Sequence, residues 1–274
     1  FAWSNPPQHN FIDRHIDAKL QRIQVLPSEV CTDAEFLRRV SLDICGLPPD
    51  PEEVTAFLDD QAADRRVRKI DELLSREDYG DAWAMRWLEM SGTTESGDSA
   101  RFKGIWTLSL WLRRMLNENL PYDRLVRELL AGKGSSIHNP AITFTVNRLK
   151  RVETVPQLFL GIRLQCAECH DHPFDTWTQA NYRSMTEFFG QLGDKEGPFD
   201  PYGREIRRFI KPELRVPWRS GERVELVHLD GSRVQVPLAS DRREALVDWM
   251  FGPGRRMASR AIVNRVWGRM LGRG

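Results

Sequence analysis

The pentapeptide Cys166-Ala167-Glu168-Cys169-His170 carries the clearest chemistry in this sequence. Two thiols three residues apart can each form a thioether bond with a vinyl group of one haem. The histidine that follows them then lies under the porphyrin plane, where it ligates the iron. The chain has only four cysteines and six histidines in 274 residues, so such a cluster rarely arises by chance. The spacing therefore predicts one covalently attached haem c, held by Cys166 and Cys169, with His170 as the proximal ligand.

The second axial ligand is not evident from the spacing. His138 lies in a loop before the motif and Met185 lies on the helix predicted after it, so these two are the leading candidates; His228 is a further one. A histidine or methionine ligand favours electron transfer, whereas an open coordination position permits small-ligand binding or peroxide chemistry. His172 is too close in sequence to His170 to reach the opposite face of the same haem. It contacts a propionate, ligates a neighbouring haem or caps the following turn.

Zinc is the alternative cofactor. Its candidate ligands in the same segment are Cys166, Cys169, His170 and His172. Two thiolates and two imidazoles satisfy a tetrahedral zinc ion, but four ligands within seven residues cannot easily surround it. Three of them with Asp175 or a distant histidine would do so more easily. The chain would then be a metal-stapled structural or binding domain of a cell-surface multidomain protein. A redox-active CxxC is disfavoured because no βαβ pattern precedes the motif.

Composition limits the partners and the compartment. The 40 basic and 39 acidic residues leave a net charge of +1, which argues against a dedicated nucleic-acid-binding face. No apolar run is long enough to predict a transmembrane segment. Haem attachment takes place in an export compartment, so the haem interpretation predicts an extracytoplasmic location. In such a compartment Cys31 and Cys45 either pair as a disulfide or remain free thiols.

The elements that must position the motif are mainly helical. Apolar spacing and caps predict helices through the first two-thirds of the chain, with a capping box at Thr32–Glu35. A helix around Val155–Leu164 is expected to lead into the motif, and another, Asn181–Gln191, to follow it. Alternating valines and leucines around Asp230-Gly231 predict a type I′ hairpin. The expected fold is a mainly α, irregular helical domain with a small β-hairpin insert near 204–238.

Several segments together resemble one known family. They are Phe11–Asp13, Phe36–Pro49, Asn119–Asp123 and Phe159–Asp175. These segments are similar to those of the DUF1549 family, also called the planctomycete cytochrome-associated domain type two. The final Ser259–Gly268, with Gly272–Gly274, resembles the start of the companion DUF1553 domain. We therefore expect a DUF1549-like helical domain over 1–192, a β-rich insert or linker over 193–240, and the start of a DUF1553-like helical region over 241–274.

The resemblance implies an exported, multidomain context rather than a reaction. Members of the family often carry a separate cytochrome c-like domain ahead of this one and the rest of DUF1553 after it. No catalytic residue follows from this pattern. We expect an electron carrier or assembly component within a larger redox assembly, rather than a stand-alone enzyme. Its expected partners are a redox protein or a neighbouring haem domain, and its own copies in a homo-oligomer or filament, with no nucleic acid.

Overall fold

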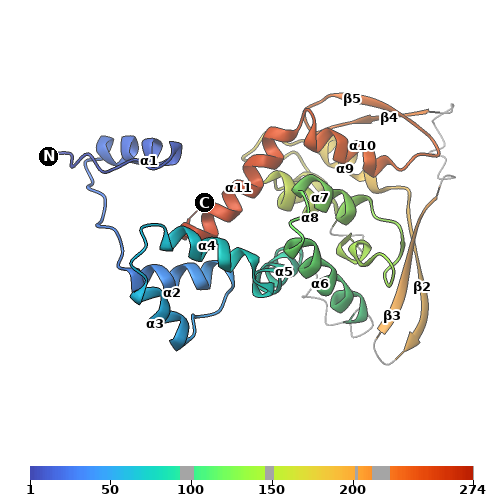
Figure 1. Ribbon diagram of the computed structural model, residues 1–274. Helices are drawn as coiled ribbons and strands as arrows, with labels where there is room; N and C mark the ends of the chain where they lie inside the picture. The colour runs from blue at the N-terminus through green and yellow to red at the C-terminus, as the bar shows by residue number, and fades with distance from the viewer. Residues whose placement is uncertain (93–101, 146–150, 201–202, 212–222, 274) are drawn as a thin grey trace.

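Helices make up most of the chain in the computed structural model, which describes residues 1–92, 102–145, 151–200, 203–211 and 223–273 (Figure 1). The helices are α1 (Phe11–Arg22), α2 (Asp33–Ile44), α3 (Pro51–Asp59), α4 (Arg65–Ser75), α5 (Glu77–Ser91), α6 (Phe102–Asn117), α7 (Tyr122–Ala131), α8 (Arg151–Val155), α9 (Gln179–Phe189), α10 (Arg242–Phe251) and α11 (Arg255–Leu271). The strands are β1 (Gly134–Ser135), β2 (Leu192–Asp200), β3 (Gly203–Ile210), β4 (Arg223–Val227) and β5 (Arg233–Pro237). The predicted fold class, mainly α with a small β insert, is confirmed.

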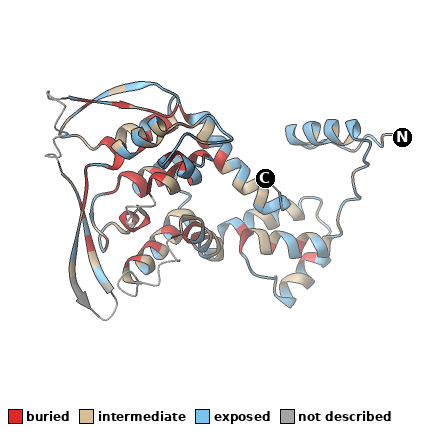
Figure 2. Cartoon of the chain, turned by 180° about the vertical axis from the view of Figure 1, so that it is seen from behind, coloured by how far each residue is buried: buried red, intermediate tan, exposed pale blue. Residues whose placement is uncertain are grey.

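The N-terminal helices form a small separate core. Helix α2 begins at the predicted capping box, where the Thr32 N–H donates to the Glu35 carboxylate at 2.8 Å. Helices α2 and α4 pack together around Ile44, Cys45 and Leu73. The Cys45 thiol is free, as is the half-buried Cys31 thiol, so the two do not form a disulfide. Helix α1 has no buried residues and lies apart from this core, as the pale blue ribbon of Figure 2 shows.

The main core lies between helices α5–α7, α9 and α10. Phe159 is fully buried near its centre, and its ring stacks on Trp87 with 6.1 Å between the ring centroids. The buried segments of these helices face one another in Figure 2. Helix α11 leaves this core beside α10 and runs toward α4 (Figure 1). None of the helices within the described residues is both long enough and apolar enough to cross a bilayer.

Two antiparallel sheets cover the side of the main core. Strands β1, β3 and β2 form one sheet in that order, and β4 pairs with β5 in the other. The predicted hairpin around Asp230-Gly231 joins β4 to β5, but its turn is not type I′: Gly231 has a φ of +82°, whereas Asp230 is not among the residues with a positive φ, and a type I′ turn requires it at both. Strand β1 pairs with β3 across more than 70 positions of sequence, with Gly134 opposite Arg208. Spacing did not indicate this contact.

A buried ion network fixes the start of the segment that leads to the CxxCH motif. The Asp194 carboxylate on β2 accepts hydrogen bonds from Arg208 Nε at 2.8 Å and from Arg151 Nη2, on α8, at 2.9 Å. Burial raises the pKa of Asp194, but the hydrogen bond and charge of Arg208 and the charge of Arg151 outweigh it and lower the pKa overall. Arg208 also donates to the Ile142 carbonyl at 2.8 Å. The network therefore ties β2, β3 and α8 together.

The helix predicted over Val155–Leu164 is not continuous. Helix α8 ends at Val155, and Pro156–Leu160 form a π-helical turn that ends at Gly161. Gly161 has a φ of +72°, in the left-handed region that glycine adopts most readily. The chain therefore turns there and leaves the helix, so Ile162–Leu164 run without helical structure into the motif.

Candidate functional site

The CxxCH motif lies on a short helical turn that is anchored to the main core. Gln165–Glu168 form one 3₁₀ turn, and the N–H of Ala167 donates to the Leu164 carbonyl at 2.9 Å. Leu164 and Ala167 are both fully buried, whereas Cys166 and Cys169 are exposed. The turn thus presents its thiols to solvent because its other face is packed against the core.

The two cysteines lie at the turn and at its end. Cys166 is in the 3₁₀ turn, and Cys169 is the C-cap residue that follows it, with its N–H donating to the Cys166 carbonyl. Neither thiol is bonded to another cysteine. An exposed pair of thiols three residues apart matches the attachment of one haem through two vinyl groups.

His170 follows the turn with one ring nitrogen already engaged. Its Nδ1 lies 2.8 Å from the Asp171 carbonyl oxygen. A carbonyl oxygen only accepts, so Nδ1 carries the proton and the lone pair of Nε2 remains for a metal. A backbone carbonyl that fixes the tautomer in this way is a common arrangement for metal-ligating histidines. The side chain itself is exposed.

The polar residues after the motif mainly fold the loop that follows it. The backbone N–H of His172 donates to the Trp177 carbonyl at 2.8 Å, and its Nδ1 accepts the Phe174 N–H at 3.2 Å. His172 thus caps the following turn, one of the three roles considered for it. The Asp171 carboxylate accepts the N–H of the first residue of α9 at 2.8 Å. The Asp175 carboxylate accepts the Trp177 indole N–H at 3.0 Å.

Two large aromatic side chains on this loop differ in their exposure to solvent. Phe174 is 95% exposed, in a chain whose other phenylalanines are mostly buried or half-buried within the described residues. Trp177 is half-buried and packs against the edge of the main core.

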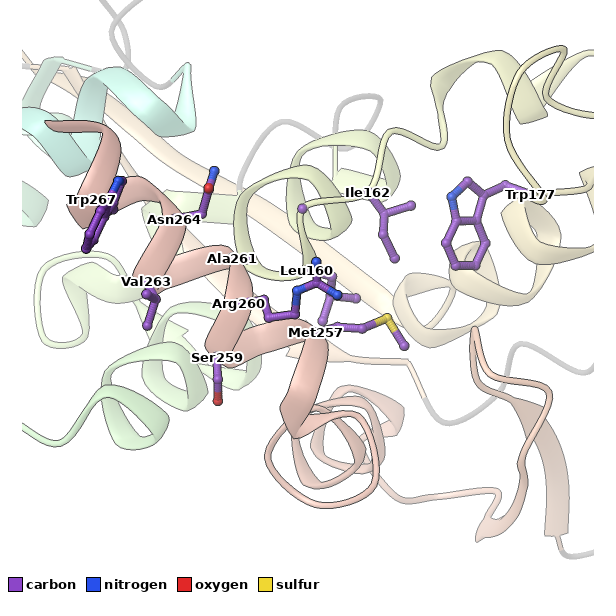
Figure 3. A pocket seen from close by; sticks show the side chains of 11 residues that line it. Leu160, Ile162, Trp177, Met257, Ser259, Arg260, Ala261, Val263, Asn264 and Trp267 are labelled. Carbon is purple, nitrogen blue, oxygen red and sulfur yellow. The ribbon is translucent and has the colours of Figure 1, made fainter. Parts of the chain in front are cut away.

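A large, mostly apolar pocket lies between helix α11 and the chain segments that flank the motif (Figure 3). Its volume of about 900 Å³ falls in the range of ligand and cofactor sites. One wall comes from the chain on either side of the motif, and its lining residues include Leu160, Ile162 and Trp177. The other wall is helix α11, with Met257, Arg260, Ala261 and Trp267 among its lining residues. Cys166, Cys169 and His170 are not among the described residues that line it.

The zinc alternative finds no matching geometry. Across the residues that the structure describes, no three histidine, cysteine, aspartate or glutamate side chains gather closely enough to hold a metal ion. Asp175, which was considered as an additional ligand, instead accepts the Trp177 indole N–H.

The structure distributes the candidate sixth ligands over three places. His138 is exposed in the turn after β1, where its charge interacts with Glu205 on β3. Met185 is 1% exposed on the inner side of α9. His228 is buried between the rings of Phe188 and Trp249, with centroid distances of 5.3 Å and 5.1 Å, and burial lowers its pKa. None of the three is among the described residues that line the pocket between α11 and the segments flanking the motif.

Two residues of the pocket were not singled out from the sequence. Met257 and Arg260 lie three positions apart on α11, on the side of the helix that lines the pocket (Figure 3). The small residues Ala258 and Ala261 are a local sequence signal for a packed face of α11, and both are buried in the structure. The contact with the segment before the motif is a tertiary one: Arg265 Nε donates to the Leu158 carbonyl at 3.1 Å.

Comparison with family models matches residues 11–194 to PSCyt2, a protein of unknown function (DUF1549). No curated protein and no solved structure matches the chain. The family match includes the CxxCH motif and the loop after it, and it extends over more than half of the chain. The chain therefore belongs to the DUF1549 family.

Proposed function

We propose that this DUF1549 protein is an extracytoplasmic c-type haem protein that carries electrons within a larger redox assembly. One observation carries the proposal: the thiols and imidazole of the CxxCH motif are exposed, and the chain segments on either side of the motif line a mostly apolar pocket of about 900 Å³. Reactive groups alone would fit several cofactors. An apolar pocket lined by the flanking segments favours a flat hydrophobic one.

Attachment of the haem needs only the two thiols. The sulfur of Cys166 would add to one vinyl group and the sulfur of Cys169 to the other, and each thiol proton would go to the neighbouring vinyl carbon. The additions would be redox neutral and need no oxidant, provided that the thiols are kept reduced until the haem arrives. The buried side chains of Leu164 and Ala167 anchor the turn, and both cysteines are exposed.

His170 supplies the proximal ligand in this proposal. Its Nδ1–H is bound by the Asp171 carbonyl, which orients the ring and leaves Nε2 for the iron. A bound haem supplies a one-electron redox centre whose potential is set by its axial ligands and burial. The partner is then another redox protein or haem domain, with homo-oligomers or filaments as one form of the assembly.

The C-terminal part of the chain belongs to the proposal as well. We assign α11 to the beginning of a DUF1553-like region, following the resemblance of Ser259–Gly268 to that domain. Since α11 forms one wall of the pocket, the haem site would lie where the two regions meet. The division of the chain at 192 and 240 remains a prediction.

Mass spectrometry of the exported protein tests the proposal. The wild-type chain is produced in a bacterial export compartment with haem-attachment enzymes and then denatured. Its mass is expected to rise by one haem. The double variant Cys166→Ser/Cys169→Ser is expected to lack the added mass, and Cys31→Ser, the matched control at a distant cysteine, to retain it.

The other outcomes separate the alternatives. A denatured wild-type chain without added mass would refute the c-type haem. If the native protein then held one zinc ion that the double cysteine variant lost, the metal-stapled structural domain would replace our proposal. A native protein with neither haem nor zinc would leave the motif as plain structure.

A further inference from the structure

Helix α1 has an apolar face that is open to solvent. The face is formed by side chains spaced three or four positions apart: Ile12, Ile16, Leu20 and Ile23. None of the residues of α1 is buried, although the helix is well formed and begins at a complete capping box at Asn10. Helices as short as this one are marginally stable alone in water, so α1 gains stability when its apolar face is covered.

An extended segment connects α1 to the N-terminal core. Residues 25–32 form neither helix nor strand, and Val25, Leu26 and Val30 are exposed along it. Figures 1 and 2 show this segment leading away from α2 to α1. Eight extended residues reach about 26–29 Å. A helix on a connection of this length and exposure is suited to exchange between two copies of a chain.

Helix α11 has a second uncovered apolar face. Four of its apolar residues follow one another at helical spacing: Val263, Trp267, Met270 and Leu271. Val263 is 62% exposed and Leu271 57%, whereas Ala258 and Ala261, on the opposite side of the helix, are buried. Val263 and Trp267 also line the pocket beside α11 (Figure 3). The chain therefore carries two helix faces of the same kind, on α1 and on α11.

The charges beside the two faces are complementary. Helix α11 contains five arginines and no acidic residue. Its Arg256 and Arg260 precede Val263 by seven and three positions, so they extend the same face, and both are exposed. On α1, Asp13 and Asp17 each follow an isoleucine of the apolar face and border it on one side. Opposite charges at the edge of an interface speed association and fix its register.

We propose that α1 of a second copy packs on the exposed face of α11, with Asp17 beside Arg260. The exchange is reciprocal: each copy gives one α1 and receives one, which closes a symmetric dimer. This contact does not depend on the haem. It gives the homo-oligomer a specific surface, formed by α1 of one chain and α11 of the other.

Sedimentation equilibrium of the haem-free chain tests the contact. We expect a wild-type dimer. Ile16→Glu and Val263→Glu are each expected to raise its Kd at least roughly a hundredfold, because a carboxylate would be buried among apolar side chains. Both positions are exposed in the single chain, so circular dichroism should show an unchanged fold. Ala18→Glu is the matched control at an exposed position outside the apolar face of α1, and it is expected to keep the wild-type Kd.

A charge exchange tests the pairing of Asp17 with Arg260. Asp17→Arg and Arg260→Asp are each expected to raise the Kd at least about threefold, because each places like charges together. The double variant restores an opposite pair and is expected to return the Kd to near that of wild type. Arg255→Asp is the control on the same helix, at an exposed position away from the apolar face, and combining it with Asp17→Arg should not restore the Kd.

The outcomes leave the proposed function and this inference separable, because the haem-free chain is used. A monomeric wild-type chain would refute the exchange. If Ile16→Glu then abolished binding to anionic phospholipid vesicles, α1 would be a membrane-surface helix instead. A dimer that is unaffected by Val263→Glu would show that α1 does not pack on α11. Failure of the charge exchange to restore the Kd would refute the pairing of Asp17 with Arg260.

Discussion

Leu164 is expected to anchor the CxxCH turn, so Leu164→Ala should destabilise the protein strongly. The side chain is fully buried in the main core, and its carbonyl accepts the N–H of Ala167 at 2.9 Å. Leucine-to-alanine changes at buried sites cost about 2.7–5 kcal/mol, depending on how far the site collapses. The exposed turn beside Leu164 can relax, so we expect a loss near the lower end, about 3 kcal/mol. This loss corresponds to a rise of roughly a hundredfold in the unfolding equilibrium constant.

Urea titration of the haem-free chain, followed by tryptophan fluorescence, measures this loss. The matched control is Arg163→Ala, because Arg163 is the exposed neighbour and its truncation should change the free energy of unfolding by no more than about 0.5 kcal/mol. A loss below about 1 kcal/mol for Leu164→Ala, or equal losses for the two variants, would contradict the anchoring role. Lower haem incorporation into folded Leu164→Ala would further link the anchor to the site.

Three further predictions address the network, the thiols and the turn before the motif. Asp194→Asn removes the negative charge between two buried arginines, and we expect it to cost about 3 kcal/mol in urea titrations at neutral pH. The pKa of Asp194 is lowered in the fold, so its carboxylate contributes to the free energy of unfolding above the unfolded pKa of about 3.9, and this contribution is lost as the pH falls below that value. An Asp194→Asn variant whose stability falls with acid as steeply as that of wild type would contradict this. In the haem-free chain, iodoacetamide should modify the exposed Cys166 and Cys169 at least roughly tenfold faster than Cys45, because burial raises the pKa of the Cys45 thiol. Equal modification rates in a peptide map would contradict the burial of Cys45. Gly161→Ala should cost about 1–2 kcal/mol, because alanine in the left-handed region strains the backbone. The added Cβ would lie an ordinary 3.7 Å from a neighbouring Cβ, so no steric clash adds to this cost. Greater stability of the variant in the same assay would show that the left-handed turn is absent.

Local signals predicted the elements whose ends are set within a few residues. The capping box at Thr32 placed the start of α2, and Asp230-Gly231 placed the β4–β5 turn, because each depends on hydrogen bonds or dihedral angles of adjacent residues. Pro156 and Gly161 are a local signal of the same kind, and they indicate that the helix expected over Val155–Leu164 is interrupted. A proline and a glycine five positions apart end a helix more strongly than apolar spacing continues it.

Long-range contacts could not be read from spacing. The motif itself was evident, as were the residues Cys166, Cys169 and His170, because their chemistry depends on neighbours in sequence. The pocket wall on α11 lies about ninety positions later in the chain and is brought to the segments that flank the motif only by tertiary packing.

The reduced pyridine spectrum of the exported, denatured chain tests the central claim most directly. Pyridine replaces both axial ligands, so the position of the α band depends on whether the vinyl groups of the haem are saturated. We predict the band of a haem with two thioether bonds in the wild-type chain, and its absence when Cys166 and Cys169 are replaced by serine. A chain without visible absorbance after export in the presence of haem-attachment enzymes would contradict the account.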